Sequence, residues 1–162
     1  ILIDGNKIDN LQNTNWLSKI SYLTQENNLI DESIIRNITF EFDDNKIDFD
    51  LLDKVCEQSG LNNLIKKLPD GYNTEIGQKG ISISGGEKQR IGIARSLYAK
   101  KEIIIFDESS SNLDDYNKIK FIKTINDLTL DKTIIIISHD QDVIKHCKIK
   151  YIIKNNDLIH SS

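Results

Sequence analysis

The sequence predicts an α/β fold, built on a mainly parallel sheet flanked by helices. Two stretches, "EIIIFD" at residues 102–107 and "TIIIIS" at residues 133–138, are rich in isoleucine and do not alternate with polar residues. Such runs are typical of strands buried on both faces. Residues 116–128, between them, repeat apolar side chains at helical spacing. This strand–helix–strand order requires parallel pairing and a right-handed crossover.

The two ends of the chain predict further strands. "ILIDGNKID" is a short apolar run followed by Asp4-Gly5, which indicates a hairpin turn. "KISYLTQ" alternates apolar and polar residues and predicts a strand that ends at Gln25. At the other end, "YIIKNNDLIHSS" predicts a closing strand or hairpin.

Helical patterns occupy most of the middle of the chain. Residues 33–68 repeat apolar side chains at helical spacing, and Gly60 is the expected end of one of these helices. A further helix is expected from Glu87 to Ala99. We therefore expect a mainly helical insert near residues 33–75.

The composition is that of a folded globular protein. The chain has 162 residues, of which 38% are hydrophobic and 28% charged. The net charge of −4 provides no overall basic field that would attract nucleic acid. No apolar run reaches the roughly 18 residues that a transmembrane helix needs. Cys56 and Cys147 lack metal-ligand spacing, so unpaired thiols in a reducing compartment are favoured over a disulfide.

The first candidate functional residues are Ser84, Gly85 and Gly86, which precede the helix expected from Glu87. Glycines at a helix start let backbone N–H groups approach an anion, and the helix dipole favours negative charge there. The simpler interpretation is an N-cap, with Ser84 as the capping residue and Glu87 completing a capping box. On this stretch alone, the N-cap is the favoured interpretation.

The second candidate pair is Asp107 and Glu108, at the end of the first isoleucine-rich strand. Ligands of open α/β sheets bind beyond the carboxyl ends of the strands. An aspartate there can hold Mg²⁺ through water, and a neighbouring glutamate can deprotonate a second water. A strand that merely ends in polar residues is the alternative.

His139 follows the second isoleucine-rich strand and is expected at the same edge of the sheet as Asp107. A single histidine is more often structural, and Gln25 alone is only a polar strand end. Their order is more informative than any one of them. Gln25, Ser84-Gly85-Gly86, Asp107-Glu108, Asp114 and His139 form one specific succession along the chain.

This succession resembles the ATP-binding cassette (ABC) family over nearly the whole chain. "ISGGEKQRIGIAR" is similar to the signature motif, usually LSGGQ, with its helix, and "IIIFDE" is similar to the Walker B strand with its catalytic glutamate. "SSSNLD" resembles the D-loop, His139 the switch histidine and Gln25 the Q-loop glutamine. "NNLIDESIIRNITF" and "TEIGQKG" resemble segments of exporter-type cassettes.

The resemblance implies a P-loop-NTPase-like fold with a helical signature subdomain over about 33–98, and a single partial cassette domain over residues 1–162. It also implies a head-to-tail dimer of two cassettes with ATP between them. Ser84, Gly85, Gly86 and Glu87 of one cassette would face the γ-phosphate held by the other. Asp114 would link the two ATP sites across the interface.

For catalysis, the resemblance implies that Asp107 and Gln25 contribute to the Mg²⁺ site. Glu108 would act as general base on the attacking water, and His139 would contact the γ-phosphate. Gln25 would also couple the site to a membrane domain. These roles fit phosphoryl transfer, which depends on positioning and charge stabilisation more than on covalent chemistry.

One family motif is absent from the sequence. A P-loop requires G-x-x-x-x-G-K-[ST], and none of the eight glycines is followed by lysine. The chain also begins at Ile1 and contains no methionine. Both observations are explained if the chain is a piece of a longer polypeptide, and if this piece starts just downstream of that polypeptide's P-loop.

Three residues depart from the family's usual pattern. Glu87 replaces the glutamine of the signature and places a carboxylate near the expected triphosphate. Asn112 replaces the usual alanine of the D-loop, and Asp140 stands where exporters often carry arginine. None of these changes removes a catalytic group.

The favoured function is that of the ATP-binding and ATP-hydrolysing domain of an ABC exporter, with ATP and Mg²⁺ at the site. The expected partners are a second cassette and a transmembrane domain upstream on the same chain, with no nucleic acid. The expected location is the cytoplasmic face of a membrane, taken to be the bacterial inner membrane.

Two alternatives remain. A DNA-maintenance ATPase shares the signature and Walker B motifs, but it would have long coiled coils before the signature, and no sustained heptads occur here. The other alternative is a non-catalytic remnant. In either case, the chain without a P-loop is expected to be inactive alone.

Overall fold

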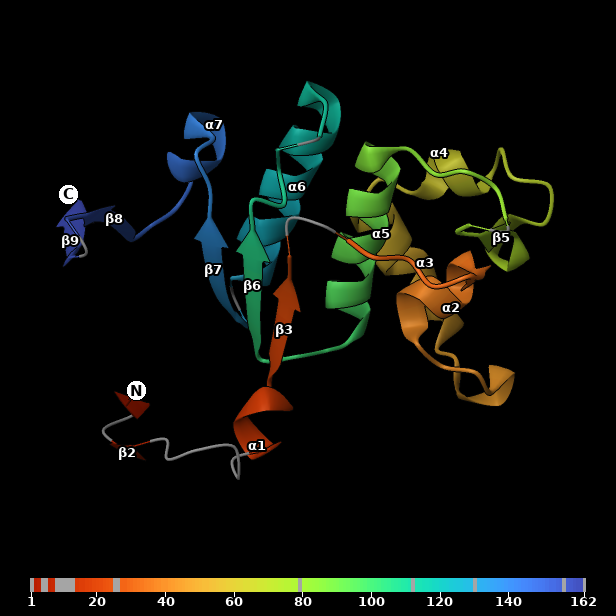
Figure 1. The fold of residues 1–162 in the computed structure, drawn as a ribbon, viewed down its shortest axis with the longest axis horizontal. Coiled ribbons are helices and arrows are strands. Elements are labelled where there is room, and N and C mark those ends of the chain that lie inside the picture. The colour runs from red at the N-terminus through yellow and green to blue at the C-terminus, as the bar shows by residue number, and fades with distance from the viewer. Residues whose placement is uncertain are drawn as a thin grey trace.

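The structure is a computed structural model that describes residues 2–3, 6–7, 14–24, 27–78, 80–111, 113–129, 131–155 and 157–161. Its centre is a parallel sheet in the order β3–β6–β7 (Figure 1). The three strands are β3 (Ile20–Leu23), β6 (Ile103–Asp107) and β7 (Thr133–Ile137). All three therefore end at the same edge. The predicted α/β class and parallel pairing are confirmed.

One face of this sheet is packed against helices. Because Leu23, Phe106 and Ile136 are neighbours in register, they share this face. Phe106 is almost fully buried and packs edge-on against Phe121 of α6 (Asp115–Leu128), with ring centroids 5.1 Å apart. Helix α6 connects β6 to β7, as the sequence predicts.

The opposite face of the sheet is open, which corrects the expectation of strands buried on both faces. Tyr22, Ile105 and Ile135 are neighbours in register on this face. Ile135 is 46% exposed, and Ile137, two residues further along β7, is 49% exposed. The isoleucine-rich pattern of β7 predicts burial on this face, but the described residues leave Ile135 and Ile137 about half exposed.

The helical insert lies beyond β3 and is covered by α5 (Gly85–Tyr98), which contacts two of its helices (Figure 1). The insert contains α2 (Ile34–Thr39), η1 (Asp44–Lys46), α3 (Phe49–Gln58), α4 (Asn62–Ile65) and η2 (Gly71–Asn73). Its fully buried side chains include Ile34, Leu52, Val55, Cys56 and Leu61, and Ile91 of α5 is buried as well.

Helix α3 ends at Gln58, and Gly60, the predicted stop signal, follows its C-cap Ser59. Gly60 has φ +76°, a conformation that favours glycine. The N–H of Leu61 donates to the carbonyl oxygen of Cys56 at 2.8 Å, and that of Gly60 to Glu57 at 3.1 Å. This pair of bonds is the Schellman arrangement, which satisfies the last carbonyls of a helix.

Short antiparallel pairs complete the fold. The predicted N-terminal hairpin is present as β1 (Leu2–Ile3) and β2 (Asn6–Lys7), with its turn at Asp4-Gly5 outside the described residues. Two exporter-like segments pair through β4 (Glu32–Ser33) and β5 (Glu75–Ile76). Helices α1 (Thr14–Leu17) and α7 (Gln141–Ile144) precede β3 and follow β7. The closing hairpin consists of β8 (Lys150–Lys154) and β9 (Asp157–Ser161).

Both cysteines are free thiols, as favoured from the sequence. Burial of Cys56 raises the pKa of its thiol to about 12. Within the described part of the chain, no helix combines the length and the apolar character needed to cross a membrane.

Candidate functional site

The carboxyl edge of the sheet brings three of the predicted residues together. Asp107 is the last residue of β6, and Glu108 follows it. The backbone N–H of Glu108 donates to the carbonyl oxygen of Ile137, the last residue of β7, at 2.9 Å. His139 follows two residues later, and its Nε2 lies 3.4 Å from Oε1 of Glu108. The expectation that His139 and Asp107 share one edge is therefore met.

Glu108 is held in an unusual backbone conformation. Its φ is +49°, in the left-handed region that costs most side chains energy. The carbonyl oxygen of Glu108 accepts hydrogen bonds from Ser111 Oγ at 2.8 Å and from Nε2 of Gln89 in α5 at 3.3 Å. The main chain of Glu108 is thus fixed from three sides, by β7, by α5 and by its own loop.

The carboxylate of Glu108 has an unused acceptor. The side chain is 19% exposed, and its Oε1 is buried and accepts no hydrogen bond from the described residues. The His139 contact is close but does not have hydrogen-bond geometry, and the imidazole itself is 98% exposed. Buried carboxylate oxygens normally have a donor, so an unpaired one is suited to receive a water molecule or a proton.

Asp107 lies on the open face of the sheet, beside Tyr22. The Tyr22 hydroxyl donates to Oδ2 of Asp107 at 2.6 Å. This hydrogen bond is the main reason why the pKa of Tyr22 is raised, with burial and the Asp107 charge adding to it. One oxygen of Asp107 is thereby oriented, and sequence reasoning did not anticipate this contact between β3 and β6.

The described residues supply only part of the ligand set expected for Mg²⁺. No group of three metal-ligating side chains occurs in the part of the chain that the structure describes. Mg²⁺ in nucleotide sites is commonly held by one or two carboxylates, water and substrate phosphates. Asp107 supplies one such carboxylate, and Gln25, the other predicted ligand, lies outside the described residues.

The signature loop begins α5 with a complete capping box. Ser84 is the N-cap, and its backbone N–H donates to Oε2 of Glu87 at 2.9 Å. The Ser84 hydroxyl donates to the same carboxylate oxygen at 2.6 Å. The backbone N–H of Glu87 completes the box by donating to Ser84 Oγ at 3.4 Å. Helix α5 starts at Gly85, two residues earlier than predicted.

Glu87 is held ionised in this loop. Partial burial acts to raise its pKa, but the hydrogen bonds from Ser84 and the charges of Arg90 and Lys67 outweigh it, so the pKa is lowered. The two donors of Ser84 that could face a phosphate are therefore engaged by a negative charge. Beside them, Gly85 faces open space, where an added Cβ would meet nothing within 4 Å.

The signature loop and the carboxyl edge are separate half-sites. Among the described residues, no hydrogen bond or ion pair joins Ser84–Glu87 to Asp107, Glu108 or His139. Figure 1 shows the first turn of α5 on the far side of β3 from β6 and β7. One chain therefore does not assemble all of the predicted residues into a single pocket.

Asp114 is the N-cap of α6. Its Oδ1 accepts the backbone N–H of Asn117 at 2.9 Å, and this bond is the main reason why the pKa of Asp114 is lowered. It stands at the end of the loop that leaves Glu108. Asn112, in the same loop, lies outside the described residues.

Arg95 is a residue that sequence reasoning missed. From α5, its Nε donates to the carbonyl oxygen of Asn37 at 2.8 Å, and its two terminal nitrogens donate to that of Asn28 at 3.3 Å. Its guanidinium also lies 4.5 Å from the ring centroid of Phe40. Arg95 thereby ties the signature helix to the segment that follows Gln25. The available signal was a cation within the apolar run of this helix.

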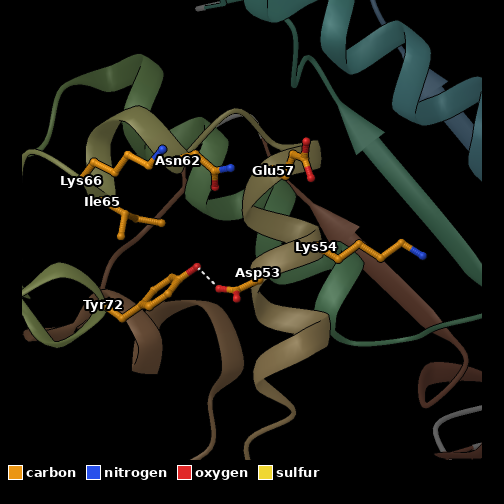
Figure 2. A pocket seen from close by; sticks show the side chains of 7 residues that line it. All are labelled: Asp53, Lys54, Glu57, Asn62, Ile65, Lys66 and Tyr72. Carbon is orange, nitrogen blue, oxygen red and sulfur yellow. Dashed lines mark hydrogen bonds between the residues drawn. The ribbon is translucent and has the colours of Figure 1, made fainter.

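Two clefts lie in the helical half of the chain. One of about 390 Å³ lies between β3 and α5 and is lined in part by Tyr22, Phe40 and Arg95. The other, of about 550 Å³, is formed by α3, α4 and η2, and includes the bond from the Tyr72 hydroxyl to Asp53 at 2.6 Å (Figure 2). Of the predicted site residues that the structure describes, none lines either cleft.

The comparisons with known proteins agree with one another. The ABC transporter family model matches residues 1–111. The chain is 34% identical to ABC transporter B family member 15 of Arabidopsis thaliana, over 99% of this chain and 13% of that protein. It is 35% identical to the alpha-hemolysin translocation ATP-binding protein HlyB of Escherichia coli O157:H7, over 98% of this chain and 22% of that protein. These relatives are four or more times longer than the matched segment.

A solved structure shows the same fold. The chain superposes on a bacterial Atm1-family ABC exporter with ATP bound, with a TM-score of 0.87 and 29% identity. The match covers 97% of this chain and 27% of that one. The longest helix described before the signature, α3, has 10 residues, which disfavours a coiled-coil DNA-maintenance ATPase. The succession of motifs, the sheet that carries them and the matched relatives lead to one conclusion: the chain belongs to the ABC transporter family.

Proposed function

We propose that the chain is most of the ATP-binding and ATP-hydrolysing domain of an ABC exporter. The observation that carries this proposal is the Glu108 carboxylate. Its buried Oε1 accepts no hydrogen bond from the described residues and lies 3.4 Å from His139 Nε2, at the carboxyl edge of a parallel sheet. This is the arrangement expected of a general base that activates water for attack on a phosphate.

In this proposal, Glu108 accepts the proton of the water that attacks the γ-phosphorus of ATP, and ADP and phosphate are released. The exposed imidazole of His139 contacts the γ-phosphate. Asp107, oriented by Tyr22, holds the hydration shell of Mg²⁺, which neutralises phosphate charge when bound. Gln25 contributes to the same shell.

The separation of the two half-sites supports a dimer. Ser84, Gly85, Gly86 and Glu87 would close on a nucleotide held by a second cassette, because they do not reach Glu108 of their own chain. Helix α5 begins at this loop, so its free N–H groups suit an anion. Asp114 would lie between the two ATP sites of a head-to-tail pair.

We further propose that a membrane domain docks at the cleft between β3 and α5. The segment that follows Gln25 lines part of this cleft. The side chain of Phe40 is exposed there, beside Arg95. A movement of the docked domain would reach α5 through the hydrogen bonds of Arg95 to Asn28 and Asn37. The ATP-binding domain would then lie at the cytoplasmic face of a membrane, and the transmembrane domain would belong to the same chain.

The test compares ATP hydrolysis by the full-length polypeptide and its Glu108→Gln variant. Glutamine cannot accept the proton, so we expect turnover to fall about 100-fold or more while ATP binding is retained. Glu102→Gln is the matched control. Glu102 lies just before β6, at the opposite end of this strand from Glu108, and its Oε2 lies 3.2 Å from Nζ of Lys19. Native turnover by the Glu108→Gln variant would refute the assignment.

A further inference from the structure

The ion pair between Lys118 and Asp140 joins helix α6 to the loop that carries His139. Nζ of Lys118 lies 2.7 Å from Oδ2 of Asp140, and each side chain is only 20% exposed. Of the ion pairs among the described residues, this is the one in which both partners are this well enclosed. Exposed pairs contribute little, whereas enclosed pairs hold a defined geometry.

Asp140 uses all of its polar groups to fix the backbone next to His139. Its N–H donates to Ser138 Oγ at 3.0 Å, and its Oδ1 accepts the N–H of Asp142 at 2.9 Å. Its Oδ2 accepts from Lys118. Since the His139 side chain is almost fully exposed, its position depends on this backbone rather than on packing of the imidazole.

Lys118 connects the same loop to Asp114. The Lys118 N–H donates to the Asp114 carbonyl oxygen at 2.8 Å, in the first turn of α6. Asp114 ends the loop that begins at Glu108. Lys118 therefore contacts the end of the loop that follows β6 through its backbone N–H, and the loop that follows β7 through its side chain.

The surroundings keep this lysine charged. The hydrogen bond to Asp140 raises the pKa of Lys118 against the opposing effect of burial, and the charges of Asp140, Asp115 and Asp142 add to the rise. The same hydrogen bond from Lys118 lowers the pKa of Asp140. Both partners are thus ionised over the neutral range, and the contact is a true ion pair there.

We propose that Lys118 is a positioning residue that, through Asp140, holds His139 within reach of Glu108 and links its position to that of Asp114. The inference rests on the proposed ATP hydrolysis. In this role, Lys118 contacts neither the nucleotide nor the attacking water. A change at Asp114, which the dimer would contact, is transmitted through the first turn of α6 to the His139 loop.

The test is a double-mutant cycle in the full-length polypeptide. Asp140→Asn keeps an N-cap for α7 while removing the charge, and Lys118→Gln removes the other charge. A displacement of about 1 Å at a catalytic group can cost about 100-fold in rate. We expect each single variant to lower kcat at least about 10-fold, with the KM for ATP changed by less than about 3-fold.

Two further variants separate positioning from general destabilisation. The double variant Lys118→Gln/Asp140→Asn is expected to have a kcat no lower than that of the slower single variant, because the two substitutions remove the same contact. Lys118→Arg keeps a cationic donor and is expected to retain native kcat. The exposed Lys123 lies on the same helix, so Lys123→Gln is the control that leaves kcat and KM unchanged.

The outcomes distinguish this inference from the function on which it rests. Native kcat in Lys118→Gln or Asp140→Asn, or losses that multiply in the double variant, would overturn the inference while Glu108→Gln remained inactive. A native polypeptide without ATP hydrolysis would remove the proposed function, and the inference with it.

Discussion

Glu108 adopts a backbone conformation that side-chain-bearing residues disfavour, and it does so at the candidate site. A non-glycine residue at φ +49° costs about 1–3 kcal/mol and persists only when neighbouring contacts impose it. Here the contacts come from Ile137, Gln89 and Ser111, on three different segments. The strain directs the side chain into a partly buried position beside His139, where its Oε1 is left without a donor.

Glu87 is the residue whose substitution should strengthen ATP binding. Its carboxylate occupies both donors of Ser84 and would repel a triphosphate. Glutamine keeps an acceptor oxygen for the capping box and removes the charge. In Glu87→Gln, we expect the ATP concentration for half-maximal hydrolysis to fall about 5-fold, the equivalent of about 1 kcal/mol for a partly screened pair of charges.

The measurement is the ATP dependence of hydrolysis by the full-length polypeptide. Glu57→Gln, which removes an exposed carboxylate from α3, is the control and should leave the half-maximal concentration unchanged. Equal or weaker ATP affinity in Glu87→Gln would show that the carboxylate does not oppose the nucleotide.

At the scale of elements, aspartate N-caps define where several helices begin. Asp48, Asp114 and Asp140 each accept a backbone N–H from the first turn of α3, α6 and α7, at 3.0, 2.9 and 2.9 Å. The pKa of each is lowered, because these hydrogen bonds, and for Asp140 the Lys118 partner first of all, favour the ionised form. Helix starts in this chain are therefore sensitive to acid.

Asp114→Asn tests this at α6. A carboxylate whose folded pKa is lowered contributes stability that is present above its unfolded value of 3.8 and is lost as the pH falls through the folded pKa. The native chain should therefore exceed Asp114→Asn in stability near neutral pH, and the difference should disappear in acid. Urea unfolding of dilute protein at about pH 7 and about pH 3 measures it.

Asp127→Asn is the matched control for this experiment. Asp127 is exposed in the last turn of the same helix, where the dipole does not favour a negative charge. Its replacement should not lower stability at neutral pH. A difference between native and Asp114→Asn that stayed constant from neutral to acid pH would contradict the assigned role of the charge.

For the whole molecule, the open face of the sheet is the dominant feature. Leu23, Ile104 and Phe106 are buried on one face, whereas Ile135 and Ile137 are about half exposed on the other. Strands that are apolar on both faces belong to sheets with two covered faces. Among the described residues, the second face of this sheet lacks such a cover.

The isolated chain of 162 residues should therefore self-associate and should not hydrolyse ATP. An uncovered apolar face is a route to association, and so is the outer edge of β7, which pairs with no further strand among the described residues. Ile135→Thr/Ile137→Thr should reduce the association, measured by sedimentation over a range of protein concentrations. Ile119→Thr, at an exposed position of α6, is the control.

Two outcomes would contradict these expectations for the isolated chain. One is a native chain that stays monomeric at all concentrations. The other is ATP turnover by the isolated chain that Glu108→Gln abolishes, which would show that the missing motif is not needed.

The sequence by itself determined the family and the main strands and helices. Isoleucine runs of strand length, the helical period at residues 116–128, the turn chemistry of Gly60 and the capping box at Ser84 each depend on neighbours in the chain, so their patterns are visible without coordinates. The order of Gln25, the signature, Glu108 and His139 was sufficient for the family because the succession is specific.

Only the tertiary structure decided which of these residues meet. The bond between Tyr22 and Asp107, the anchoring of Arg95 and the ion pair of Lys118 with Asp140 join segments that are far apart in the sequence. The same holds for the separation of the signature loop from Glu108 and for the open face of the sheet. Strand register and helix packing set these contacts, and neither is encoded by a local pattern of residue types.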